Sequence, residues 1–165
     1  MKIRYLGSLL ALFLIVTTAC AGPTPSSPTL SSPTSSNSAS DWQTYSNPEA
    51  GFSIRYPSTW NFEVLPDQNS GALHGVSLSG AEGGVELYWG VGLGGGCAAE
   101  VIQKVKVAQG ELQTCYGKNA DETERWENIS KELSAASFSA RAYTTDATSS
   151  SHDLVLQVIS TLSFP

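Results

Sequence analysis

The sequence predicts an α+β domain in which an antiparallel sheet is packed by one or two helices, one of them at the C-terminus. Short segments of alternating apolar and polar residues recur between turns rich in glycine, proline and asparagine, as in antiparallel strands. The last segment instead repeats its apolar residues at helical spacing. An apolar N-terminal segment followed by a Ser/Thr/Pro-rich one places the start of this domain near residue 41.

Residues 1–19 have the features of a signal peptide. Lys2 and Arg4 precede about twelve mostly apolar residues, the length of a signal core and too short for a permanent membrane span. Small residues then precede Cys20, a pattern that resembles a bacterial lipoprotein signal. The resemblance implies that Cys20 becomes the lipidated first residue, anchored in the cell envelope at the outer face of a bacterial membrane. The alternative is ordinary secretion, with cleavage before Gly22.

Residues 20–40 are predicted to be the lipidated cysteine and a disordered linker. From 21 to 40 the chain carries no charge, and Leu30 is its one large apolar residue. Such a composition cannot bury enough apolar surface to offset the entropy of ordering. We expect a tether that reaches at most about 60 Å, followed by a single domain over residues 41–165.

Charge excludes one class of partner. Without Lys2 and Arg4, seven basic residues face 15 acidic ones, a net charge of −8. A chain this acidic is a poor candidate for binding nucleic acid, whose phosphates require Lys and Arg. An anionic membrane surface would also repel it, so the lipid, rather than a basic patch, is expected to hold it there.

The first half of the domain is predicted to form five strands. Asn-Pro and Gly in the segment 47–51 favour a turn, and Pro57 ends the strand before it because proline cannot donate to a ladder. Loops are expected at 66–72 and 81–84. The expected strands cover residues 42–46, 52–56, 61–65, 74–80 and 85–91.

The second half is predicted to contain a hairpin, two further strands and a helix. The hairpin joins 104–107 to 111–116. Residues 124–130 fit a helix or a strand, and a strand is favoured because 137–145 follows with strict alternation. In the segment 149–162, Ser150 or Ser151 is expected to cap a helix, and Asp153 to lie in its first turn. The apolar face of this helix comprises Leu154, Val155, Val158, Ile159 and Leu162.

The opening of the domain, WQTYSNPEAGFSIRYPSTW (42–60), resembles that of PsbP-like domains. The closing segment, LVLQVISTLSF (154–164), is similar to the final helix of that family. These parts cover about a quarter of the domain. The resemblance implies an α-β-α sandwich and a non-catalytic accessory or scaffold role. No binding residue is carried over, because the middle of the chain does not align with the photosynthetic members.

Cys97 and Cys115 are predicted to form a disulfide. The compartment is expected to be oxidising, and two cysteines are too few for a cysteine-rich zinc site. The bond would close a loop of about 19 residues and stabilise the domain by roughly 3 kcal/mol. A metal site or free thiols are the alternatives.

The segment LYWGVGLGGGC (87–97) contains five glycines. It lacks the Lys of a P-loop and the acidic partner of a dinucleotide fold. We expect a flexible loop at the end of a strand, with positive φ at several positions, held by the disulfide. The alternative is contact of exposed backbone N–H groups with a ligand. Its candidate ligand-binding residues are Trp89, Gly94, Gly95 and Gly96.

Other side chains that could bind a ligand or take part in catalysis are expected to have structural roles. Trp60, Trp89 and Trp126 could line a groove, but core positions are favoured because each ring buries a large area. The acidic turn 121–127 is expected to be solvated, with Ca²⁺ binding by its carboxylates as the alternative. His74 and His152 are single, and no spacing marks a catalytic triad. The four carboxylates of that turn are Asp121, Glu122, Glu124 and Glu127.

These observations predict a lipid-anchored accessory or binding protein, rather than an enzyme, with no catalytic residue, metal or cofactor assigned. Its expected partners are the membrane, through the lipid anchor, and an envelope protein. The alternative is a small-ligand or metal-ion binding lipoprotein that uses the glycine-rich loop and the acidic turn.

Overall fold

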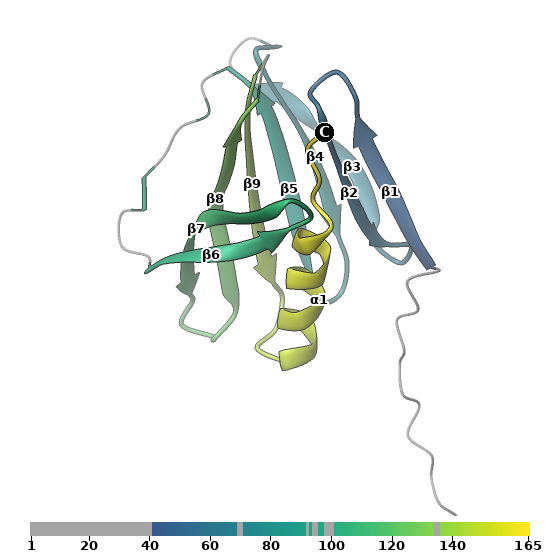
Figure 1. Cartoon of the computed structure of the whole chain (residues 1–165). Helices are drawn as coiled ribbons and strands as arrows, with labels where there is room; N and C mark the ends of the chain where they lie inside the picture. The colour runs from purple at the N-terminus through teal and green to yellow at the C-terminus, as the bar shows by residue number, and fades with distance from the viewer. Residues whose placement is uncertain (1–40, 69–70, 92, 94–95, 98–100, 134–135) are drawn as a thin grey trace, which may run out of the picture. The chain divides into compact units, whose positions relative to one another are not determined.

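The computed structural model describes residues 41–68, 71–91, 93, 96, 97, 101–133 and 136–165. The predicted signal peptide and linker, and Gly94 and Gly95, lie outside the described residues. Within these ranges the chain forms nine strands and one helix (Figure 1). They are β1 (Trp42–Asn47), β2 (Phe52–Pro57), β3 (Asn61–Gln68), β4 (Leu73–Ser79), β5 (Gly83–Gly90), β6 (Val101–Val107), β7 (Gly110–Lys118), β8 (Glu124–Glu132), β9 (Ser137–Thr144) and α1 (Ser149–Ser160).

Seven strands form one antiparallel sheet in the order β3-β4-β5-β9-β8-β7-β6, and β1 pairs with β2 in a separate two-stranded sheet. The predicted α+β class is therefore confirmed. Because β9 inserts between β5 and β8, the glycine-rich segment after β5 connects strands that are four positions apart in the sheet. This connection leads to β6, which is an edge strand.

Alternation along β5 and β9 separates the two faces of the large sheet. Val85 and Leu87 lie opposite Ala142 and Ala140, and all four are buried on what we call the inner face. The residues between them point to the outer face, where the Arg141 Nε lies 3.2 Å from the Glu86 carboxylate. This period of two is the pattern from which the strands were predicted.

The core lies between the inner face, α1 and β2. The helix contributes Val155, Val158 and Ile159, each at most 1% exposed. From β2, the Phe52 ring lies 4.9 Å from that of Phe138 on β9. The large sheet, α1 and β2 therefore share one apolar core. Figure 1 shows how these elements are arranged.

The start of the helix differs from the prediction. The N-cap is Thr148, whose hydroxyl accepts a hydrogen bond from the Ser151 amide at 3.3 Å. Ser150 and Ser151 therefore lie inside the helix rather than at the cap. Asp153 falls beyond the first turn, which contains no acidic residue. Thr148 was missed because the run of serines offers several equally good capping side chains.

Several strand boundaries differ from those predicted. β5 begins at Gly83, inside the predicted loop 81–84, and β6 begins at Val101, before the predicted start at residue 104. Residues 66–68, predicted to belong to a loop, extend β3 to Gln68 across a register shift. Residues 124–130 form a strand as favoured, but a bulge lies between Trp126 and Ile129, where Asn128 has a φ of 54°. Positive φ was expected at several glycines of the glycine-rich segment; of its two described glycines, Gly90 has a φ of 132° and Gly96 has no positive φ.

None of the helices in the described part of the chain is long and apolar enough to cross a membrane.

Candidate binding groove

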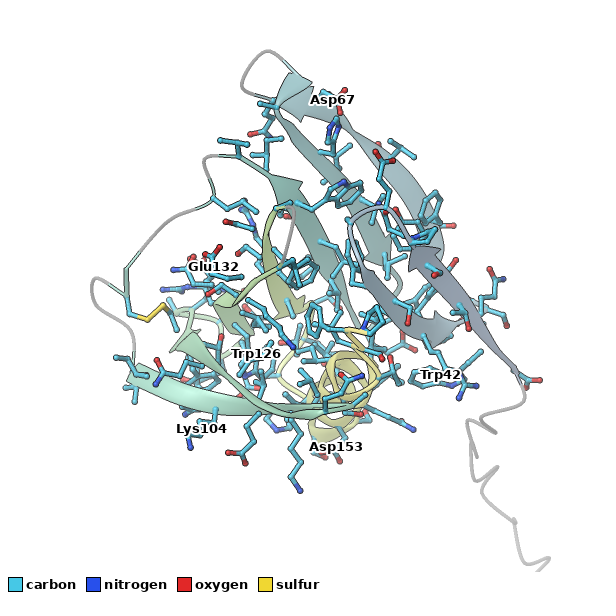
Figure 2. The ribbon with its side chains drawn as sticks, turned by 45° about the horizontal axis from the view of Figure 1, so that its top comes forward. Trp42, Asp67, Lys104, Trp126, Glu132 and Asp153 are labelled. Carbon is cyan, nitrogen blue, oxygen red and sulfur yellow. A yellow bond between two sulfur atoms is a disulfide. The ribbon has the colours of Figure 1, made fainter. Side chains whose placement is uncertain are left out.

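A cavity of about 460 Å³ lies between α1 and the edge strand β6, and we call it the α1–β6 groove. This volume is within the range of ligand-binding clefts. Figure 2 labels one residue from each of three walls, Lys104 on β6, Trp126 on β8 and Asp153 on α1. The remaining lining residues are Gln103, Val105, Lys106, His152, Leu156, Gln157 and Ser160.

The β6–β7 hairpin is held over the helix by its inner-face residues and by its turn. Val105 and Val107 are buried in the core. At the turn, the Ala108 amide donates to the Leu162 carbonyl at 2.9 Å. The Gln109 side chain donates to the Ser163 hydroxyl at 2.6 Å and accepts from the Phe164 amide at 3.1 Å. The segment after α1 is therefore joined to the turn of this hairpin.

A cluster of polar side chains underlies one end of the groove, centred on Glu124. One carboxylate oxygen accepts from the Tyr116 hydroxyl at 2.5 Å, and the other lies 2.5 Å from the His152 Nδ1. The Lys118 ammonium is 3.7 Å away. Because Glu124 is only 9% exposed, these contacts replace most of the water that a carboxylate would otherwise bind.

The contacts hold Glu124 in its ionised form. Burial raises the pKa of this carboxyl, but hydrogen bonds from Tyr116 and His152, with the charges of His152 and Lys118, outweigh burial, so the pKa lies below its usual value. Burial, together with the neighbouring Glu124 carboxylate, raises the pKa of Tyr116 to about 12. Tyr116 is therefore a neutral donor and Glu124 a charged acceptor.

His152 connects the Glu124 cluster to the groove. Its Nδ1 edge is occupied by Glu124, and its ring lies 5.6 Å from that of Trp126. The side chain is 37% exposed and lines the groove, so the edge with Nε2 is the part offered to a bound group. With Nδ1 engaged by Glu124, the Nε2 atom is the ring nitrogen left to hydrogen-bond a bound group.

The prediction that the acidic turn is solvated is wrong for Glu124. The structure separates this residue from its neighbours: Asp121 accepts hydrogen bonds from Thr123, and Glu127 lies 3.6 Å from the Arg125 side chain. Glu122 remains exposed near Lys118. Glu124 alone turns inward, since it lies on the same face of β8 as Trp126. Among the described residues, no group of three or more His, Cys, Asp or Glu side chains could hold a metal ion.

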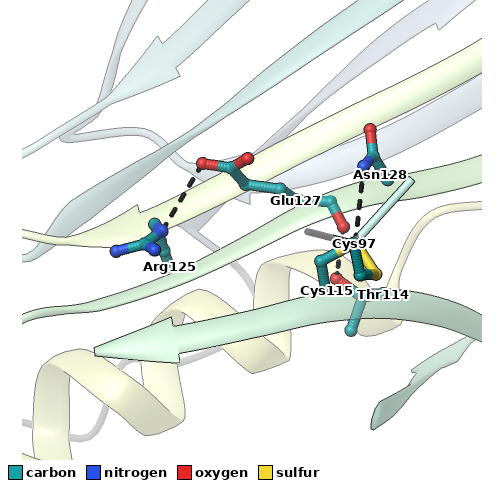
Figure 3. Close-up of a disulfide and its surroundings, with 6 residues drawn as sticks. All are labelled: Cys97, Thr114, Cys115, Arg125, Glu127 and Asn128. Atoms are coloured by element: carbon teal, nitrogen blue, oxygen red, sulfur yellow. Dashed lines mark hydrogen bonds and ion pairs between the residues drawn. A yellow bond between two sulfur atoms is a disulfide. The ribbon is translucent and has the colours of Figure 1, made fainter. Parts of the chain in front are cut away.

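Cys97 and Cys115 form a disulfide with their Cα atoms 5.3 Å apart, as predicted (Figure 3). Cys115 is buried, and its sulfur accepts a hydrogen bond from the Asn128 side chain at 3.4 Å. The bond thus attaches the end of the glycine-rich segment to β7 beside the bulge in β8. Gly96 and Cys97 line a separate cavity of about 240 Å³.

The predicted aromatic residues divide between core and surface. Trp60 and Trp126 are buried, as favoured. Trp89 is half-buried and lines a third cavity, of about 350 Å³, with His74. The His74 Nδ1 lies 2.8 Å from the Asp67 carboxylate. Of the candidate ligand residues, Trp89 and Gly96 thus line different cavities, and Gly94 and Gly95 lie outside the described residues.

Comparisons with protein-family models, with curated proteins and with solved structures found no match for this chain.

Proposed function

We propose that this chain is a lipid-anchored extracytoplasmic protein whose domain is a non-catalytic binding or accessory domain, and that the α1–β6 groove is its binding surface. The signal-like segment that ends at Cys20 and the uncharged linker support the anchor. The disulfide between Cys97 and Cys115 is consistent with an oxidising compartment outside the cytoplasm.

The observation that carries this proposal is the groove itself. It combines a volume of about 460 Å³ with apolar side chains, Val105 and Leu156, and with polar groups on both sides. Ligand sites combine a mostly apolar lining with a few polar groups held in place. His152 is such a group, because Glu124 fixes the orientation of its ring.

A binding role fits the Glu124 cluster better than catalysis does. The carboxylate is held by Tyr116, His152 and Lys118, and these contacts join the first turn of α1 to β7 and β8. Its ionised oxygens are thus engaged by the protein rather than offered to a substrate. His152 remains to orient a bound group.

We further propose that the domain is PsbP-like, although its described residues form a single helix, α1, rather than helical layers on both faces of the sheet. The residues that carry the resemblance occupy structural positions: FSIRYP forms β2, Trp60 is buried, and the C-terminal segment forms α1 and packs on the sheet. The family would imply an accessory subunit or scaffold.

The test is chemical cross-linking of the lipidated protein in intact envelopes, with palmitate labelling in parallel. We expect Cys20-dependent labelling and one reproducible, stoichiometric cross-linked partner. Cys20→Ser should abolish both the label and membrane retention. A Cys20→Ser chain that still carries palmitate would refute the anchor, and cross-links to random neighbours only would refute the accessory role.

A further inference from the structure

We propose that the α1–β6 groove binds an extended segment of a partner protein that adds a strand to the free edge of β6. In this segment, acidic residues that face Lys104 and Lys106 alternate with apolar residues that face the groove. The inference rests on the proposed binding role of the groove and specifies the chemistry of its partner. Strand addition supplies affinity through main-chain hydrogen bonds and specificity through alternate side chains.

The register of β7 shows which backbone groups of β6 are free. The Asn119 amide donates to the Thr123 carbonyl at 2.9 Å, which continues the β7–β8 ladder. Because successive residues of a strand direct their backbone groups to opposite sides, odd-numbered residues of β7 bond to β8 and even-numbered ones to β6. Their partners on β6 are odd-numbered, for example Val105 opposite Leu112.

The N–H and C=O groups of Ile102, Lys104 and Lys106 therefore point away from β7. In the part of the chain that the structure describes, β6 pairs with β7 alone. The Ala108 amide, next in this series, donates to the Leu162 carbonyl of the segment after α1. That contact places the free edge on the side of the helix, where the groove lies, and ends the open part of the edge at Lys106.

The two faces of β6 differ in chemistry. Val105 faces the core and lines the groove across from Leu156 on α1. Lys104 and Lys106 also line the groove, but they alternate with Val105 and so lie on the outer face of the strand with Ile102, which is 64% exposed. A strand added to this edge would continue both faces, so its alternate residues would meet either apolar groove or positive charge.

The positive charge of β6 favours an added strand that carries acidic residues. β6 carries two lysines and no acidic residue, in a mature chain with a predicted net charge of −8. The Lys104 ammonium lies 3.4 Å from the Glu111 carboxylate across the hairpin, in an exposed pair. Exposed pairs of this kind are weak, so both lysines can approach a further carboxylate on an adjacent strand.

The same lysines disfavour pairing of β6 with the β6 of another copy, because like charges on adjacent strands repel. The opposite edge of the sheet, β3, contains Pro66, which lacks an N–H, and the acidic Glu63 and Asp67. The acceptor edge for an acidic strand is therefore β6 rather than β3.

The test uses the purified lipidated chain in detergent and fluorescein-labelled Glu-Val-Glu-Val-Glu-Val as the probe. Fluorescence anisotropy should detect saturable binding that weakens as salt rises, and Lys-Val-Lys-Val-Lys-Val should bind at least tenfold more weakly.

Lys104→Pro removes an edge N–H without removing a bond to β7. The matched variant Lys104→Ala loses the same charge and keeps the N–H. We expect Lys104→Pro to bind several-fold more weakly than Lys104→Ala.

Hydrogen exchange on the wild-type chain provides a measurement that does not depend on a variant folding. The acidic peptide should slow exchange of the amides of Ile102, Lys104 and Lys106.

Strand addition would be overturned by any of three results: equal binding of the two peptides, equal affinity of the two Lys104 variants, or unchanged exchange at these amides. Self-association that Glu63→Lys abolishes, and that excludes the peptide, would overturn it in favour of a second copy. A partner cross-linked to the groove despite no peptide binding would overturn strand addition alone and leave the proposed function intact.

Discussion

The Nδ1 of His152 lies 2.5 Å from a carboxylate oxygen of Glu124, although 28 residues separate them in the chain. The contact joins the first turn of α1 to the first residue of β8. It ties the start of the helix to the sheet beside the α1–β6 groove. The same contact leaves one edge of the imidazole at the groove.

Glu124→Gln should make the free energy of unfolding less dependent on pH in the acidic range. The folded-state pKa of Glu124 lies below its usual value of 4.5, so its stabilising contribution is complete above that pH and is lost as pH falls through the lower folded pKa. We expect the variant to lose about 1 to 3 kcal/mol at pH 7, because a charged hydrogen-bonded group is replaced, and progressively less as the pH falls below 4.5. Urea unfolding across this range measures it, with the exposed Glu122→Gln as the control. A constant difference between wild type and Glu124→Gln at all pH values would contradict the assignment.

Tyr116 should ionise late in an alkaline titration. Its pKa is raised to about 12, so its contribution to stability is present below pH 10 and is lost as pH rises through 12. Absorbance at the tyrosinate band should contain a transition near pH 12 that Tyr116→Phe reduces. Tyr88, whose pKa is also raised to about 12 by burial and by Glu86, should supply the remainder of that transition. An unchanged profile in Tyr116→Phe would show that its hydroxyl is not held by Glu124.

Removing the disulfide should cost stability without abolishing the sheet. The bond joins residues 18 apart in sequence, and such a loop contributes about 3 kcal/mol in the chain-entropy model. We expect the double variant Cys97→Ser, Cys115→Ser to lose about this amount in urea unfolding while keeping its far-UV spectrum. Thiol counting on the unreduced wild type should find no thiol from this pair. Two reactive thiols from Cys97 and Cys115 would exclude the bond.

Gly90→Ala should be far more disruptive than Gly96→Ala or Gly110→Ala. At Gly90, φ is 132° and a Cβ would lie 2.1 Å from the Ala72 carbonyl oxygen, which belongs to the backbone and cannot move aside cheaply. Gly110 has a similar φ of 134° but open space around it, and Gly96 has open space without a positive φ. We expect the loss of thermal stability to rise from Gly96→Ala to Gly110→Ala to Gly90→Ala. Equal losses of thermal stability in Gly90→Ala and Gly110→Ala would show that the backbone strain of positive φ, rather than the clash with the Ala72 carbonyl, dominates.

The sequence predicts the strands and the helix because each has a local periodic pattern. Trp126 and Ile129 illustrate the limit of such patterns. Their spacing suits a helix as well as a bulged strand, and the bulge at Asn128 depends on the pairing of β8 with β9. The order of strands in the sheet is a tertiary property, so the edge position of β6 could not be derived from periodicity.

The Glu124 cluster was missed because three adjacent carboxylates in the same turn are solvated, as predicted for all four. One signal was available: Glu124 precedes Trp126 by two residues and so shares its face of a strand. In the same way, His152 precedes Leu156 by four residues and shares its stripe of the helix. The contact between these two faces arises only when α1 packs on the sheet.

Site-specific photo-cross-linking in intact envelopes tests the groove most directly. A photoreactive residue would replace Gln157, an exposed groove residue on α1, or Thr44, an exposed residue on β1 outside the groove. If the α1–β6 groove is the binding surface, the variant at position 157 captures one stoichiometric partner and the variant at position 44 does not. Capture of the same partner from Thr44 with none from Gln157 would contradict the account.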